Sequence, residues 1–177
     1  IRTLAEVFKR EGYDTAAFTG GQPFTAKAGF ARGFDAFVDT APFRSAGTVF
    51  AEARAWLEGR KGRGPFFLLL HGYDAHSHNF VRRQLPPDLA DADKEDPFYK
   101  LWEKFRKIQA EALGPEIYTP EERRLLRETY DQRIGPGDAA LGNFMSFLRR
   151  EELADRTVIA FYSNHGDGIF DHQIAGH

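Results

Sequence analysis

Pro65-Phe66-Phe67-Leu68-Leu69-Leu70-His71 is a run of five apolar residues between a proline and a histidine. Its length and composition are typical of a strand buried on both faces, as in parallel or mixed sheets covered by helices. The residues that end it, His71 to His78, include three imidazoles and a carboxylate. Because ligands of open α/β sheets bind at the carboxyl ends of the strands, we expect this cluster to border a crevice.

A second run of the same kind lies near the end of the chain. Thr157 to Tyr162 is rich in β-branched and aromatic residues, which predicts another strand. It stops at Ser163-Asn164-His165-Gly166-Asp167-Gly168, where the residues become small, polar and able to bind ligands. The two glycines allow a sharp turn beneath these side chains.

The remaining sequence alternates between helical and extended patterns. Apolar spacing predicts helices over 3–12 and 46–58, a strand over 13–19 and an irregular, phenylalanine-anchored segment over 24–38. Phe98, Leu101, Trp102 and Phe105 have helical spacing. The alternation predicts an α/β fold with a mostly parallel sheet flanked by helices.

A long helix is expected after Thr119, because Thr119, Pro120 and Glu122 fit an N-cap, a first helical position and a capping box. Its expected inward residues are Leu125, Leu126, Tyr130, Ile134, Leu141, Phe144 and Leu148. Gly135-Pro136-Gly137 interrupts the pattern, and we expect a break or kink there because proline removes an amide donor.

Composition limits the classes of function. With 177 residues, 42% of them hydrophobic, the chain can bury one core, so we expect a single domain over 1–177 with 80–118 as an excursion. The 24 basic and 26 acidic residues give no electrostatic reason to propose a nucleic-acid partner. No apolar run is long enough to cross a bilayer, and the absence of cysteine excludes disulfides and thiolate chemistry in this sequence. Compartment and oligomeric state are left open.

Several short motifs follow one another in a distinctive order. They are Thr3 to Thr15, Gly29-Phe-Ala-Arg-Gly-Phe-Asp35, Pro65 to His71 with Asp74-Ala-His76, Tyr130-Asp131 with Ile134, Asp138 and Leu141-Gly142, and Ser163-Asn-His-Gly166. In this order the chain resembles the sulfatase family of the alkaline phosphatase superfamily over nearly its whole length except 80–118. The resemblance implies a partial alkaline-phosphatase-like core.

The resemblance also implies a hydrolase of small-molecule or glycan sulfate esters that uses one divalent cation, Ca²⁺ or Mg²⁺, bound by oxygen-rich ligands. Asn164 and His165 match the family's metal ligands in the turn after the last strand. His76 matches the histidine that contacts the substrate anion or the leaving oxygen, and His177 corresponds to a later anion-contacting histidine. The cation and nearby basic side chains would neutralise the ester oxygens during nucleophilic attack.

Three departures from the family bear on activity. Asn164 stands where the family usually has aspartate, so we expect weak metal binding or none. Lys27 is only a weak substitute for the family's anion-contacting lysine. The paired aspartates and the nucleophile turn are expected before Ile1, which indicates an internal fragment that is inactive on its own.

Alternatives remain open. Thr40-Ala-Pro-Phe-Arg44 fits a nucleophile turn but follows the Gly-Phe-Asp segment that should come after it, so we interpret it as an incidental loop pattern. Phosphoester or phosphonate hydrolysis, or phosphoryl transfer, uses the same parts on this fold. A catalytically inactive domain with a binding or structural role is the third alternative.

The other polar residues of the two turns have structural interpretations. We expect His71 to be a packed strand-end residue, and Asp74 to cap its turn or to orient His76. Asp167 is expected to stabilise the glycine-rich turn. For His78 a functional role is the less favoured interpretation, and Asp171 and His172 are expected to be solvated residues of a surface turn.

Overall fold

The computed structural model describes residues 1–21, 23–60, 64–76, 82, 84–86, 88–111, 114–171 and 174–176. The chain divides into two units, each with its own apolar cluster. Unit 1 comprises Ile1–Asp74 and Pro136–Val158, and unit 2 comprises Ala75–Gly135 and Ile159–His177. A single domain over 1–177, with 80–118 as an excursion, stays a prediction.

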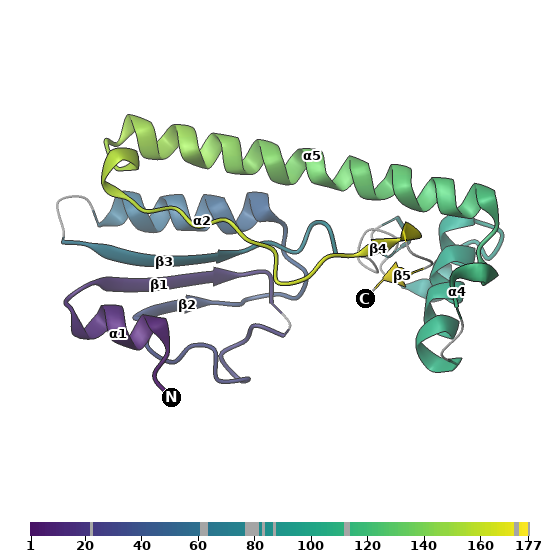
Figure 1. The fold of residues 1–177 in the computed structure, drawn as a ribbon, viewed down its shortest axis with the longest axis horizontal. Coiled ribbons are helices and arrows are strands. Elements are labelled where there is room, and N and C mark those ends of the chain that lie inside the picture. The colour runs from purple at the N-terminus through teal and green to yellow at the C-terminus, as the bar shows by residue number, and fades with distance from the viewer. Residues whose placement is uncertain are drawn as a thin grey trace. The chain divides into compact units, whose positions relative to one another are not determined.

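Unit 1 is built on a parallel sheet of β1 (Asp14–Thr19), β2 (Ala36–Val38) and β3 (Phe66–His71) in the order β2-β1-β3 (Figure 1). This pairing confirms the predicted α/β fold with a mostly parallel sheet flanked by helices. The six residues of β3 are only partly buried, whereas the sequence predicted burial on both faces. The reason is that, among the described strands, β3 has a neighbour on one side only.

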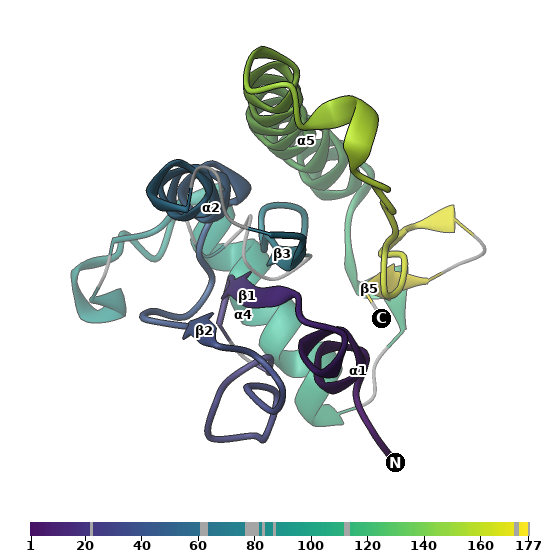
Figure 2. The ribbon, with the colours of Figure 1, turned by 90° about the vertical axis from the view of Figure 1, so that its left-hand side faces the viewer.

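Helices cover both faces of the sheet in unit 1 (Figure 2). α1 (Leu4–Arg10) contributes Phe8, whose ring stacks on Phe67 of β3 at 4.7 Å between centroids. α2 (Ala46–Gly59) packs on the opposite face. There Leu68, the next residue of β3, packs against the apolar cluster that includes the buried residues of α2. The two faces therefore follow the alternation of side chains along the strand.

The core of unit 1 lies between α2, the sheet and the last turns of α5 (Pro120–Arg150). Its buried members are Ala16, Phe18, Val49, Ala53, Leu57, Phe144, Phe147 and Leu148. Phe147 is only 2% exposed, and full burial of such a side chain stabilises a fold by about 1.5–3 kcal/mol. The small residues Ala16 and Ala53 allow the strand and the helix to approach closely.

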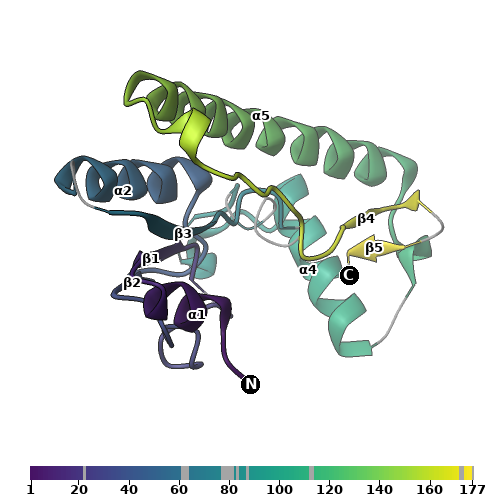
Figure 3. The ribbon, with the colours of Figure 1, turned by 60° about the vertical axis from the view of Figure 1, so that its left-hand side comes forward.

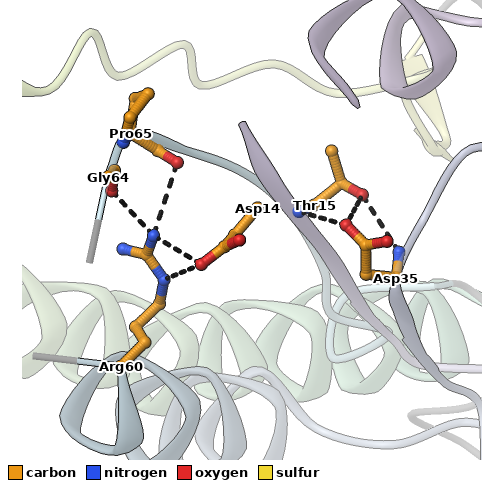
Figure 4. Close-up of polar contacts among 6 residues, drawn as sticks. All are labelled: Asp14, Thr15, Asp35, Arg60, Gly64 and Pro65. Carbon is orange, nitrogen blue, oxygen red and sulfur yellow. Dashed lines mark hydrogen bonds and ion pairs between the residues drawn. The ribbon is translucent and has the colours of Figure 1, made fainter. Parts of the chain in front are cut away.

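The guanidinium of Arg60 bonds to residues at the amino-terminal ends of β1 and β3 (Figure 4). Arg60, which follows α2, donates from Nη2 to the carboxylate of Asp14 at 2.9 Å and to the carbonyl of Gly64 at 2.7 Å. It donates more weakly to the carbonyl of Pro65, and its guanidinium lies 5.0 Å from the centroid of Trp56. Arg60 thereby connects the end of α2 to the beginnings of β1 and β3.

Thr15 and Asp35 hold β2 beside β1 (Figure 4). The backbone amide of Thr15 donates to the Asp35 carboxylate at 3.1 Å, and the amide of Asp35 donates to the Thr15 hydroxyl at 3.0 Å. Lys9 adds an ion pair to Asp35 at 2.5 Å. These contacts place the following Ala36–Val38 in register with β1, which forms a short strand inside the segment predicted to be irregular.

Unit 2 combines helical segments with a small antiparallel hairpin (Figure 3). Its described elements are η1 (Leu89–Asp91), α4 (Pro97–Glu111), η2 (Pro115–Ile117), the first part of α5, β4 (Gly168–Ile169) and β5 (Ala175–Gly176). Leu101, Tyr118 and Leu126 form the buried centre, with exposed fractions of 1%, 5% and 8%. The helical spacing around Leu101 is thus confirmed.

α5 begins at the predicted capping box and runs without interruption to Arg150. The amide of Thr119 donates to the Glu122 carboxylate at 2.7 Å, and the amide of Glu122 donates to the Thr119 hydroxyl at 3.3 Å. A break or kink was predicted at Pro136. The break is wrong, because turns on both sides of Pro136 are anchored in the two cores, and a kink stays a prediction. Ile134 was also predicted to face inward, but it is 47% exposed. Neither α5 nor any other helix of the described residues is long and apolar enough to span a bilayer.

The predicted strand over 157–162 is wrong. After η3 (Ala154–Arg156), these residues are irregular and pair with no described strand. Val158 and Phe161 are 97% and 82% exposed. Strand propensity reflects a fit to a pleated, half-buried surface, so composition alone forms no strand where no neighbouring strand supplies hydrogen bonds.

Candidate active site

The carboxyl ends of β1 and β3 meet at Thr19 and His71, which are paired in the sheet. Thr19 is fully buried, and its hydroxyl donates to the carbonyl of Phe24 at 2.9 Å and accepts from the amide of Gly21 at 3.3 Å. Both directions of hydrogen bonding are therefore used to fold the turn that follows β1. Thr19 therefore stabilises this turn and leaves its hydroxyl unavailable to a ligand.

His71 is packed among aromatic rings. Its ring centroid lies 4.5 Å from that of Phe24 and 5.5 Å from that of Tyr73. Its Nδ1 is buried and has no hydrogen-bond partner among the described residues. Burial lowers the pKa of the imidazole, because the apolar surroundings disfavour the charged form. These observations support the structural interpretation of His71.

The Thr40–Arg44 pattern forms a structural loop. Arg44 is 7% exposed and donates from Nη1 to the carbonyls of Thr19 at 3.2 Å and Val38 at 3.4 Å, while Nη2 forms an ion pair with Glu52. The guanidinium thus binds the ends of β1 and β2 to α2. An arginine held in this way is unavailable to a neighbouring nucleophile, which supports the interpretation of this pattern as incidental.

Asp74 fixes the turn after β3. Its carboxylate accepts a hydrogen bond of 2.5 Å from the amide of Ala46, at the beginning of α2. A carboxylate at a helix amino terminus satisfies an otherwise unpaired amide and interacts favourably with the helix dipole. Gly72 allows this close approach, because a Cβ there would lie 2.9 Å from that of Ala46. Asp74 therefore connects the turn to α2 within unit 1.

His76 and His165, far apart in the sequence, lie together in unit 2. Their ring centroids are 5.8 Å apart, with an interplanar angle of 83°. This edge-to-face arrangement joins the turn after β3 to the turn that follows the irregular 157–162 segment. The two histidines are the residues that the sequence singled out as an anion contact and a metal ligand.

The turn that carries His165 is organised by its own polar groups. The Ser163 hydroxyl donates to the carbonyl of His165, and Nδ1 of His165 lies 3.0 Å from the carbonyl of Gly166. If Nδ1 carries the proton and donates to that carbonyl, Nε2 bears the lone pair that a metal ion or a proton would take. Asn164 is exposed beside it. His177, like His78 and His172, lies outside the described residues.

The described residues provide only part of a cation site. No group of three or more histidine, aspartate or glutamate side chains among them is arranged to hold a metal ion. Asn164 offers a neutral carbonyl oxygen and His165 a ring nitrogen, whereas Ca²⁺ takes six to eight oxygen ligands in proteins. These two donors therefore fit part of a coordination shell and do not complete one.

A protein-family model, Sulfatase, matches the chain over residues 1–177. The chain belongs to the sulfatase family. The match covers the whole sequence, including the 80–118 segment that the motif resemblance left out. No solved structure matched this sulfatase-family chain.

The sequence offered no signal for one further electrostatic interaction in unit 2. Tyr130 of α5 is near enough to Asp167, which follows the His165 turn, for the charge of Asp167 to act on its phenol. Burial raises the pKa of the Tyr130 phenol, and the negative charges of Asp167 and Asp131 raise it further. The Tyr130-Asp131 motif was quoted for its order alone, and only the fold shows that it lies near this turn.

Proposed function

We propose that the turns carrying His76 and His165 form the anion-binding part of a sulfatase site that hydrolyses sulfate esters. The observation that carries this proposal is the ring contact between these two histidines, at 5.8 Å between centroids. Family membership supplies the reaction class, because sulfatases act on sulfate esters. The contact supports the choice of these two turns, because it brings the imidazoles of His76 and His165 next to each other.

Each residue has a chemical task in this proposal. Protonated His76 would donate a hydrogen bond to a sulfate oxygen or to the leaving oxygen, where negative charge develops during cleavage of the ester. His165 and Asn164 would contribute a nitrogen and an oxygen to a divalent cation, Ca²⁺ or Mg²⁺. When bound, such a cation would neutralise the sulfate oxygens. His177 is proposed as a further anion contact.

Asn164 sets the expected strength of cation binding. A neutral amide oxygen replaces the carboxylate that the family usually has at this position, and affinity for hard cations depends on ligand charge. We expect the wild-type chain to bind Ca²⁺ weakly or not measurably, and Asn164→Asp to bind it at least about tenfold more tightly. Isothermal titration calorimetry with CaCl₂ measures the difference.

Asn143→Asp is the matched control, because it makes the same change at an exposed position of α5 that belongs to unit 1, whereas Asn164 belongs to unit 2. It should bind Ca²⁺ as the wild type does. If Asn164→Asp also binds like the wild type, Asn164 does not stand at a cation position. Titration with sodium sulfate, followed by the ring signals of His76 and His165 in NMR spectra, tests the anion part. If neither ring signal moves, the proposed anion contact is refuted.

A further inference from the structure

α5 connects the apolar clusters of the two units through a stretch with no buried residue. Leu126 is 8% exposed in the cluster of unit 2, and Phe144 is 8% exposed in the cluster of unit 1. Residues 131–143, all of them described, are exposed or only partly buried. Because packing on a core supplies most of the stability of a helix in a protein, this stretch depends mainly on its own propensity.

Gly135-Pro136-Gly137 lies within this stretch. Proline has no backbone N–H, so the carbonyl of Gln132 receives no hydrogen bond from position 136, and the proline ring crowds that carbonyl. Glycine is the next least favourable residue in a helix interior. The sequence therefore places its three weakest consecutive helix formers in the part of α5 that has no buried residue.

Packing gives no reason for the two glycines. A Cβ added at Gly135 would meet no atom within 4 Å, and one at Gly137 would meet only the Cβ of Asp74, at 4.0 Å. Elsewhere the chain does use glycine for space, since a Cβ at Gly33 would lie 2.4 Å from the amide nitrogen of Glu6. Conformational freedom is the remaining physical property that glycine supplies at 135 and 137.

The boundary between the two units crosses α5 at this tripeptide, between Gly135 and Pro136. The chain also passes from one unit to the other between Asp74 and Ala75, in a turn, and between Val158 and Ile159, in the irregular segment. α5 is thus the one helix or strand among the described residues that continues from one unit into the other. We propose that Gly135-Pro136-Gly137 is a hinge, where α5 opens reversibly so that the two units can turn relative to each other.

Hydrogen exchange of the whole chain tests the local opening. The amides of Asp138 and Ala139 donate within the proposed hinge, and they should exchange at least about tenfold faster than those of Phe147 and Leu148. In the variant G135A/P136A/G137A their exchange should slow by at least about tenfold, because alanine restores both the amide donor and helix propensity. The hinge would be overturned if the amides of Asp138 and Ala139 exchanged as slowly as those of Phe147 and Leu148 in the wild type. It would also be overturned if the exchange of Asp138 and Ala139 did not slow in the variant.

Distance distributions test the motion between the units. The sequence has no cysteine, so spin labels attach only at Ala55→Cys on α2 and Lys107→Cys on α4, both exposed positions in different units. Electron–electron double resonance should give a narrower distribution in G135A/P136A/G137A than in the parent. Gly142→Ala is the control, because Gly142 is also an exposed glycine of α5 with open space around it. Equal widths in all three proteins, or equal narrowing in both variants, would refute a hinge at 135–137.

Discussion

Replacement of Arg60 by alanine tests how the amino-terminal edge of the sheet in unit 1 is held together. Arg60 is 7% exposed and donates to the carbonyls of Gly64 and Pro65 and to the Asp14 carboxylate. Its guanidinium also lies over two rings, 5.0 Å from the centroid of Trp56 and 5.1 Å from that of Phe66. The substitution removes all of these contacts and leaves the two carbonyls without this donor.

The expected decrease in the free energy of unfolding on Arg60→Ala follows from how deeply each contact of Arg60 is buried. Charge-assisted bonds to carbonyls in a part-buried setting and the two ring contacts together stabilise the fold by about 3 kcal/mol. The ion pair adds little, because the Asp14 side chain is 42% exposed and water screens it. Asp14→Asn should therefore cost less than about 1 kcal/mol.

Urea unfolding, followed by circular dichroism, measures these free energies. Arg54→Ala is the matched control, because Arg54 also pairs with a carboxylate and lies 5.1 Å from the Phe147 centroid, but its side chain is 52% exposed. It should cost less than about 1 kcal/mol. If Arg60→Ala costs no more than Arg54→Ala, the buried guanidinium is not a structural connection and the reasoning is wrong.

Two further predictions concern the start of α5 and the packed histidine. Thr119→Ala should lower the free energy of unfolding by about 1 kcal/mol in urea, because it removes the hydroxyl that accepts from the Glu122 amide; unchanged stability would contradict the observed cap. Because burial lowers the pKa of His71, its contribution to stability should be complete above about pH 6.5 and be lost as the pH falls through its lower folded-state pKa. An NMR titration should show its imidazole neutral where an ordinary histidine is half protonated, and a midpoint at or above about 6.5 would contradict this.

The elements that could be predicted from the sequence depend on contacts between near neighbours. Thr3 and Glu6 cap α1, and Thr119 and Glu122 cap α5, through side chains three residues apart. Each pattern is complete in the sequence because both partners belong to one turn of helix. The five apolar residues before His71 likewise carry enough β propensity and hydrophobicity to indicate β3.

The predictions that were wrong concern residues whose partners lie far away in the sequence. Ala36–Val38 becomes a strand because Asp35 is bound to Thr15, which no local pattern reveals. The run over 157–162 has the composition of a strand but lacks a paired neighbour among the described residues. Pro136 is tolerated inside α5 because distant cores anchor both ends.

The candidate site shows the same division between local and distant information. The residue types in the two turns indicated binding chemistry. The expectation that the two turns belong to one site rested on the order of motifs in the sulfatase family and not on their spacing in the sequence. The structure places His76 against His165. The roles of these two residues, and those of Asn164 and His177, stay predictions.

The polar residues closest to the strand ends are used for folding, and this explains why candidate chemistry lies farther along the turns. Thr19 binds the backbone of its own turn, Arg44 binds the ends of β1 and β2, and Asp74 binds the beginning of α2. Parallel strands that end together leave loop amides and carbonyls that must be satisfied, and these side chains satisfy them. These three side chains are therefore unavailable to a ligand, and His76 and His165 stay the candidates for binding one.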